Sequence, residues 1–167
     1  MLRARLRAMK TIYIETSIVS YLKARPSKDL LGAAWQNATN DWWETQRGQF
    51  DLYTSQLVVE EAGKGNADAA QRRMEALSTI PHLSMPNPVA DLAIALLNES
   101  ALPKKATDDA FHVAISAYHG MDYLLTWNCR HINNAGMKPL MRHVCSVQGY
   151  ACPEICTPLE LMGEENE

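Results

Sequence analysis

Residues 12–20 read "IYIETSIVS", an apolar run that ends at one acid, Glu15, and is followed by two small polar residues. Residues 11–14 are β-branched and aromatic and apolar almost throughout, which is typical of a strand covered on both faces. Thr16 or Ser17 can then cap a helix over 18–24, which must stop before Pro26. Glu15 is therefore expected at the carboxyl end of a buried strand, either as a solvated loop residue or as a ligand of an active site.

The rest of the chain alternates between strand-like and helical segments. Further candidate strands lie at 50–55, 82–85, 122–127 and 153–158, and candidate helices at 28–47, 56–65, 66–80, 86–102 and 107–120, with a last helix capped by Thr157. Residues 133–150 mix helix and loop features. This alternation predicts an α/β protein with three layers, α/β/α, and a mostly parallel central sheet of four or five strands. In the helix at 28–47 the apolar stripe includes Leu30, Leu31, Trp35 and Trp42, with the tryptophans as core anchors.

Length and composition limit the possible classes of protein. A chain of 167 residues that is 47% hydrophobic can bury one core, so we expect a single domain over 10–162, a leader at 1–9 and an acidic tail at 163–167. No apolar run reaches the roughly 18 residues that a membrane span needs, and we expect a cytoplasmic protein without membrane contact. The formal charge of −3 means that nucleic-acid binding would need a local basic patch. The four cysteines lack zinc-site spacing and are expected to be reduced.

Several side chains with oxygen ligand atoms are expected at the carboxyl edge of the parallel sheet, where the loops after the strands lie close together. Glu15 and Asn128 follow strand-like segments, and Glu61 and Asp109 lie on helices that can reach the same edge. Carboxylates brought close together repel unless one takes a proton or a cation neutralises them, and Mg²⁺ or Mn²⁺ suits oxygen ligands. On this pattern alone, a metal site and a set of unrelated capping or solvated acids are equally good interpretations.

Four segments, in order along the chain, resemble a PIN domain of the VapC-like branch. They read "IYIETSIVSYL" at 12–22, "TSQLVVEEAGKGN" at 54–66, "DDAFHVAISAYHGMDYLLTWNCRHI" at 108–132 and "ICTPLEL" at 155–161. The resemblance spans most of the chain and implies a PIN-like fold. It also implies a metal-dependent ribonuclease that uses Mg²⁺ or Mn²⁺, of a kind that often serves as the toxin of a type II toxin–antitoxin pair.

The resemblance assigns four site residues. Glu15 stands where the family has its first-strand aspartate, and Glu61, in the pattern S-x5-E from Ser55, matches the helix glutamate. Asp109 matches the aspartate of the third motif, and Asn128 stands where many members carry a fourth aspartate. A glutamate at 15 is one methylene longer than the aspartate, which a metal site tolerates only if its backbone or water shell retreats. Asparagine at 128 keeps an oxygen ligand but removes a charge, so a second metal would bind more weakly.

These matches suggest a division of roles. Glu15 and Asp109 are the expected metal ligands, Glu61 would orient the attacking water, and Asn128 would position outer waters or a phosphate oxygen. Side chains expected to orient the acids by hydrogen bonds are Thr16, Ser17, Thr126 and His112, the last of these through Asp109.

RNA contacts and partners are less directly indicated. Arg130 and His131 should lie at the rim of the crevice and contact RNA phosphates, with Lys138, Arg142 and His143 as possible neighbours. A cognate antitoxin and a homodimer are expectations from the resemblance alone.

Two other functions compete with the nuclease. The departures at 15 and 128 are compatible with a catalytically weakened PIN-like module that binds RNA or protein. A Mg²⁺-dependent phosphatase of another α/β fold would need an aspartate nucleophile with a second aspartate two residues later, and "ETS" at 15–17 has neither.

Overall fold

The computed structural model describes residues 8–163, and its centre is a five-stranded sheet in which all neighbouring strands are parallel. The strand order is β3-β2-β1-β4-β5. The strands are β1 (Lys10–Ile14), β2 (Phe50–Ser55), β3 (His82–Leu83), β4 (Tyr123–Leu125) and β5 (Glu154–Cys156). The predicted α/β class and parallel sheet are therefore confirmed.

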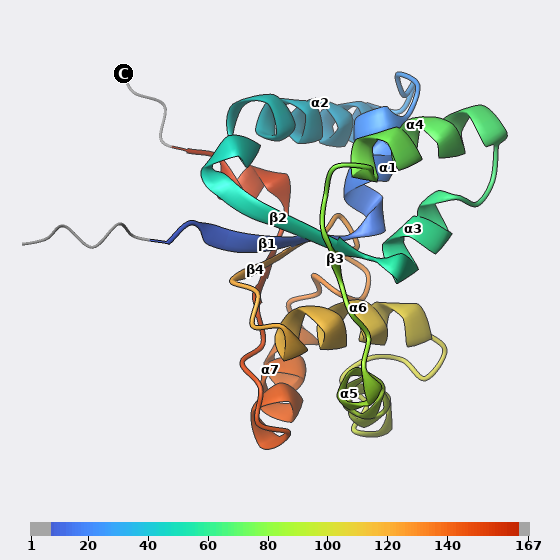
Figure 1. Cartoon of the computed structure of the whole chain (residues 1–167). Coiled ribbons are helices and arrows are strands. Elements are labelled where there is room, and N and C mark those ends of the chain that lie inside the picture. The colour runs from blue at the N-terminus through green and yellow to red at the C-terminus, as the bar shows by residue number, and fades with distance from the viewer. Residues whose placement is uncertain (1–7, 164–167) are drawn as a thin grey trace, which may run out of the picture.

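Helices cover both faces of this sheet. Those in the described residues are α1 (Thr16–Lys23), α2 (Leu30–Thr45), α3 (Gln56–Ala62), α4 (Ala67–Leu77), α5 (Asn87–Asn98), α6 (Thr107–Tyr118) and α7 (Lys138–Val147), with short 3-10 turns at Arg47–Gln49 and Pro158–Leu161. In Figure 1, α1, α2 and α4 lie on one side of the sheet and α5, α6 and α7 on the other. This arrangement is the α/β/α layering that the alternation of segments predicts.

The first strand is apolar because it lies in the middle of the sheet and is covered on both faces. Ile12, Tyr13 and Ile14 are fully buried. Ile12 pairs with Leu52 of β2 on one side and with Tyr123 of β4 on the other. Parallel strands point their carboxyl ends to the same edge, so the residues after β1 and β4 meet there.

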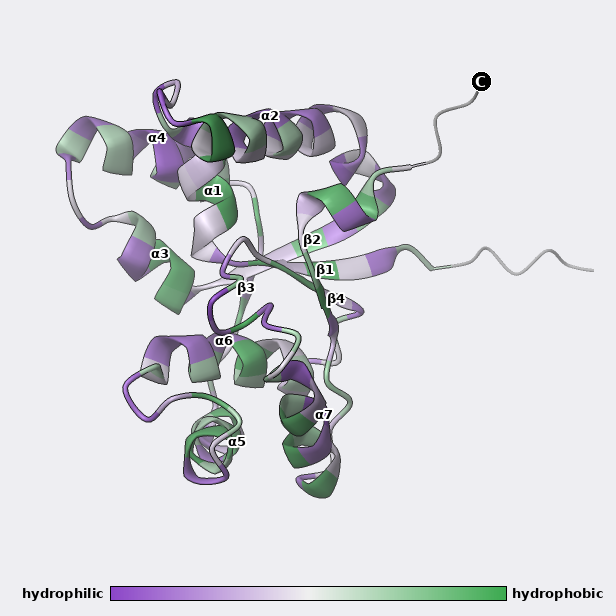
Figure 2. Cartoon of the chain, turned by 180° about the vertical axis from the view of Figure 1, so that it is seen from behind, coloured by the Kyte–Doolittle hydropathy of each residue, from purple (hydrophilic) through white to green (hydrophobic). Residues whose placement is uncertain are grey.

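Helix α7 resolves the segment whose pattern was undecided in the sequence. It buries Met141, Val144 and Cys145 against the core. In Figure 2 hydrophobic and hydrophilic stretches alternate along its turns, as expected for a helix with one buried face. Pro139 in its first turn fits the preference of proline for the start of a helix.

Helix α2 departs from the predicted apolar stripe at its start. Leu30 and Leu31 are 88% and 58% exposed, because nothing in the described residues packs over the first turn. Trp42 is fully buried, as expected, whereas Trp35 is half-buried and stacks on Trp127 with ring centroids 4.8 Å apart. The helix is therefore anchored by its aromatic residues and not by its leucines.

The ends of the chain bear on three further expectations. The predicted cap at Thr157 forms, with the Glu160 carboxylate accepting from the Thr157 N–H at 2.7 Å, but the turn that it starts is a 3-10 helix. The predicted leader and acidic tail fall largely on residues 1–7 and 164–167, outside the described residues. None of the helices described is both long enough and apolar enough to cross a membrane.

Asp122 ties the start of β4 to the start of β1. Its carboxylate accepts hydrogen bonds from the Thr11 N–H at 2.9 Å and from Lys10 Nζ at 3.1 Å. The Thr11 backbone N–H, followed by the other donors, holds the pKa of Asp122 below its ordinary value of 3.8. A lowered pKa in the folded state means that the ionised carboxylate stabilises the fold above that value.

We expect Asp122→Asn to lower the free energy of unfolding at neutral pH by about 1 kcal/mol, because it weakens charge-assisted hydrogen bonds. The difference from the wild type should shrink as the pH falls through the lowered pKa, since both side chains are then neutral. Urea unfolding over a pH series measures both values. Asp51→Asn on the exposed side of β2 is the control, with an effect within about 0.5 kcal/mol. A difference for Asp122→Asn that does not change with pH would contradict this account.

Candidate metal centre

The site lies at the carboxyl edge of the sheet, where β1 runs directly into α1. Glu15 is the residue between them, and it is 6% exposed. Its own carboxylate caps α1 by accepting from the Ser17 N–H at 3.1 Å. The expected cap at Thr16 or Ser17 is therefore wrong, because the longer glutamate side chain folds back onto the helix that it precedes.

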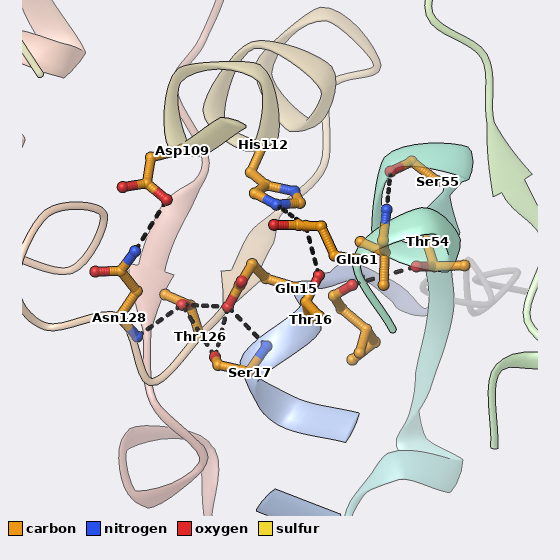
Figure 3. A network of polar contacts seen from close by, with 12 residues as sticks. Glu15, Thr16, Ser17, Thr54, Ser55, Glu61, Asp109, His112, Thr126 and Asn128 are labelled. Atoms are coloured by element: carbon orange, nitrogen blue, oxygen red, sulfur yellow. Dashed lines mark hydrogen bonds and ion pairs between the residues drawn. The ribbon is translucent and has the colours of Figure 1, made fainter. Parts of the chain in front are cut away.

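One carboxylate oxygen of Glu15 is held by three protein donors. Oε2 accepts from the Ser17 N–H and hydroxyl and from Thr126 Oγ1 at 2.7 Å. Figure 3 shows these three contacts converging on the same oxygen from α1 and from the end of β4. No described residue donates to the other oxygen, Oε1. The predicted orienting roles of Ser17 and Thr126 match these hydrogen bonds, and Oε1 remains available to a ligand.

Glu61 comes from α3, a helix that begins at the Ser55 cap directly after β2. Its Oε1 accepts from Thr16 Oγ1 at 2.7 Å and lies 2.7 Å from His112 Nε2, while no described residue donates to its Oε2. Burial tends to raise the pKa of Glu61, but the hydrogen bond and charge of His112, together with Thr16 and Lys64, outweigh it and hold the pKa below 4.5. Glu61 is therefore ionised at neutral pH.

His112 lies on α6 and is fully buried. Its Nδ1 is 2.8 Å from the Tyr13 hydroxyl, which also contacts Ser55 Oγ at 2.8 Å. Burial lowers the pKa of His112, but the hydrogen bond to Glu61 and the charges of Glu15, Glu61 and Asp109 raise it above 6.5 overall. The sequence suggested a bond from His112 to Asp109, whereas the structure directs both ring nitrogens to other groups.

Asp109 lies one turn before His112 on α6 and faces a different set of partners. Its Oδ1 accepts from Asn128 Nδ2 at 3.1 Å, and its Oδ2 lies 2.8 Å from His131 Nδ1. Asn128 in turn donates its N–H to Thr126 Oγ1 at 2.9 Å and accepts from the His131 N–H at 3.0 Å. Both oxygens of Asp109 are therefore engaged, and Thr126 links this group to Glu15.

Three side chains come close enough to hold one metal ion. Ligand atoms of Glu15, Glu61 and His112 all lie within 4.8 Å of one another. Asp109, expected as a ligand from the sequence, is not part of this group, and Glu61 and His112 take its place beside Glu15. The i, i+3 spacing of Asp109 and His112 had suggested His112 as a partner of Asp109, but nothing in the sequence indicated that it lies beside Glu15 and Glu61.

The donor set of the cluster fits a divalent cation. Glu15 and Glu61 each use one oxygen within the protein and leave the other without a hydrogen bond from a described residue. Carboxylates placed this close together repel each other unless a cation neutralises them. A cation between them would relieve the remaining repulsion.

A cavity of about 400 Å³ lies beside Glu61. Lys105, Asp109 and His131 line it, and Lys105 had not been singled out from the sequence. Arg130 follows β4 and is exposed.

Two of the three other predicted basic neighbours, Arg142 and His143, lie elsewhere. Arg142 pairs with Glu154 at 3.5 Å, at the amino end of β5 and so at the opposite edge of the sheet. Lys138 Nζ donates to Asn133 at 2.8 Å. His143 lines a separate hollow with Glu99 and Val147. The basic groups at the site are therefore fewer than the sequence suggested.

No known family model matches the chain, and no characterised protein matches its sequence. Fold and site together define an α/β protein with a five-stranded parallel sheet and a buried cluster of two glutamates and a histidine that could hold a metal ion.

We expect Glu61→Gln to weaken Mn²⁺ binding about tenfold or more, because it removes a charge and a free carboxylate oxygen from the cluster. Titration calorimetry or the electron paramagnetic resonance of free Mn²⁺ measures the affinity. Glu60→Gln, on the adjacent and exposed position of α3, is the matched control and should bind Mn²⁺ as the wild type does. Equal loss in both variants would exclude the cluster as the specific site.

The Glu61–His112 pair should also make stability depend on pH when metal is chelated. Because the pKa of His112 is raised in the folded protein, His112 contributes its full stabilisation of the fold below pH 6.5. This stabilisation is lost as the pH rises through the pKa of the folded state. Because the pKa of Glu61 is lowered in the folded protein, Glu61 contributes its full stabilisation above pH 4.5. This stabilisation is lost as the pH falls through the pKa of the folded state. The free energy of unfolding of the wild type should therefore exceed that of Glu61→Gln by the largest amount between pH 4.5 and pH 6.5. A difference that is flat across this range, measured by urea unfolding with EDTA, would contradict the pairing.

Proposed function

We propose that the protein is a metal-dependent endoribonuclease of the PIN-domain type, in its VapC-like branch, which hydrolyses RNA phosphodiester bonds. The single observation that carries the proposal is that Glu15 and Glu61, from segments 46 residues apart, each offer a carboxylate oxygen to one cluster whose ligand atoms lie within 4.8 Å of one another. The parallel α/β fold and the site at its carboxyl edge are compatible with the family that the sequence resembles.

The ion that suits this cluster is Mg²⁺ or Mn²⁺. Two of the three candidate ligands are carboxylates, whose oxygens hard divalent ions prefer, and the third is the imidazole of His112, which also contacts Tyr13 and Glu61. When bound, such an ion polarises a scissile phosphate and lowers the pKa of a bound water. Glu15 and Glu61 would hold it.

The protein groups around the two glutamates have separate tasks in this proposal. Ser17 and Thr126 fix Glu15 so that its free oxygen keeps one orientation, and Thr16 and His112 do the same for Glu61. The extra methylene of a glutamate at 15 is accommodated because the carboxylate folds back to cap α1. The departure from aspartate is therefore compatible with an ordered site.

Asp109, Asn128 and His131 form a second group, of which Asp109 and His131 line the cavity. Asp109 orients His131 through its Nδ1 and Asn128 through its amide, and these two residues with Lys105 and Arg130 would contact phosphate oxygens of the RNA. This assignment gives Asp109 the task of positioning substrate-binding residues in place of the direct ligation expected from the sequence.

The biological role proposed is that of the toxin in a type II toxin–antitoxin pair, in the cytoplasm. A cognate antitoxin would have to block an acidic crevice, which an inserted arginine or lysine accomplishes by pairing with Glu15 and Glu61. A homodimer is part of the same proposal and rests on the resemblance alone.

Cleavage of a 5′-labelled structured RNA with Mn²⁺ tests the activity. The wild type should release fragments with 5′-phosphate and 3′-hydroxyl ends, and Glu15→Gln should lower the rate about 100-fold or more because it removes a charge that holds the ion. Glu60→Gln, which is exposed and has no contact with the cluster, should cleave at the wild-type rate. Cleavage that survives Glu15→Gln would remove this site from the mechanism. Absence of cleavage with any divalent ion, together with tight RNA binding, would favour the non-catalytic binding module.

A further inference from the structure

A second cavity, of about 300 Å³, lies between α1 and α4 and is lined by three arginines. Arg25 follows α1, and Arg72 and Arg73 lie on α4; the remaining lining includes Ser20, Ala24 and Asn66. Figure 1 shows α1 running beside α4 on the side of the sheet away from α6. No carboxylate side chain lines this cavity.

The three guanidinium groups are placed without any acid to neutralise them. Arg72 Nε donates to the Lys23 carbonyl at 3.1 Å, and Arg73 donates to the Ala62 carbonyl at 2.8 Å and to the Lys64 carbonyl. Within residues 8–163 no carboxylate pairs with Arg25, Arg72 or Arg73, and Arg25 donates no side-chain hydrogen bond. In a chain of net charge −3, these are uncompensated positive charges gathered at one hollow.

Ser20 and Ala24, which line this cavity, share one face of α1 with Thr16, the residue that donates to Glu61. Thr16, which donates to Glu61, is four residues before Ser20, and Ser20 is four residues before Ala24. Residues at this spacing share a helix face, and eight residues span about 12 Å of helix. The cavity lining therefore begins one turn beyond Thr16 on the face of α1 that contacts Glu61.

We propose that the α1–α4 cavity binds backbone phosphates of single-stranded RNA at nucleotides next to the cleaved bond. Guanidinium groups free of carboxylate partners match phosphate by charge and by forked hydrogen bonds. At about 3.4 Å per stacked nucleotide, the 12 Å path corresponds to three or four nucleotides. The proposal rests on the proposed nuclease function and assigns part of its substrate surface. RNA is favoured over an acidic protein segment because the cavity lies on the same face of α1 as Thr16, which contacts Glu61.

Binding measured without catalysis separates this proposal from the nuclease activity. A fluorescein-labelled 12-nucleotide single-stranded RNA is titrated with protein in EDTA, and its anisotropy is followed over a series of salt concentrations. Arg25→Ala should raise the Kd about fivefold and reduce the slope of log K against log salt by about 0.7, as expected for one lost phosphate contact. Arg25→Glu should raise the Kd further. Arg47→Glu, an equal charge change at an exposed position at the opposite edge of the sheet, should leave both quantities close to wild type.

The outcomes distinguish the two proposals. RNA cleavage in Mn²⁺ with no effect of either Arg25 variant on Kd or salt slope would overturn the phosphate site and leave the nuclease standing. Loss of RNA affinity in Arg25→Glu, with no cleavage by the wild type, would support the phosphate site while the nuclease fails. Unchanged RNA binding combined with lost binding of a polyglutamate peptide would overturn the RNA proposal in favour of an acidic protein partner. Circular dichroism of each variant confirms that the fold is intact.

Discussion

The burial of one carboxylate at the junction of β1 and α1 is the constraint on which the site depends. A glutamate side chain that is only 6% exposed is costly to bury unless hydrogen-bond donors compensate it, and the fold brings three donors to a single oxygen of Glu15. Two of them belong to Ser17, at the start of α1, and the third, Thr126, is delivered by the pairing of β4 with β1. Sheet register and site geometry are thus linked through one side chain.

A second buried side chain, His112, links the central strand to the other glutamate of the site. It connects Tyr13 in the central strand with Glu61 on α3, so that a chain of short contacts runs from Ser55 through Tyr13 and His112 to Glu61. Buried polar networks of this kind are stable only when every member has a partner. The network holds Glu61 beside Glu15 despite their like charges, and the pair of free oxygens that results is what makes a cation site chemically reasonable.

Much of the fold could be predicted from the sequence, because the alternating pattern and the apolar first strand reflect burial on both faces of a parallel sheet. The placement of Glu15 at the edge followed from the same argument. The partners of His112 and Asp109 could not be predicted, since one turn of helix separates them and only tertiary packing decides which neighbour each side chain meets. The exposure of Leu30 and Leu31 has the same origin: periodicity identifies an apolar face but not whether another element covers it.

Anomalous diffraction from a crystal soaked in Mn²⁺ tests the central claim most directly, because it locates the ion and its ligands without requiring activity. The account predicts one peak at a bonding distance of about 2 Å from a carboxylate oxygen of Glu15 and from one of Glu61. A peak held by Asp109 without either glutamate, or no peak at the cluster in saturating Mn²⁺, would contradict it.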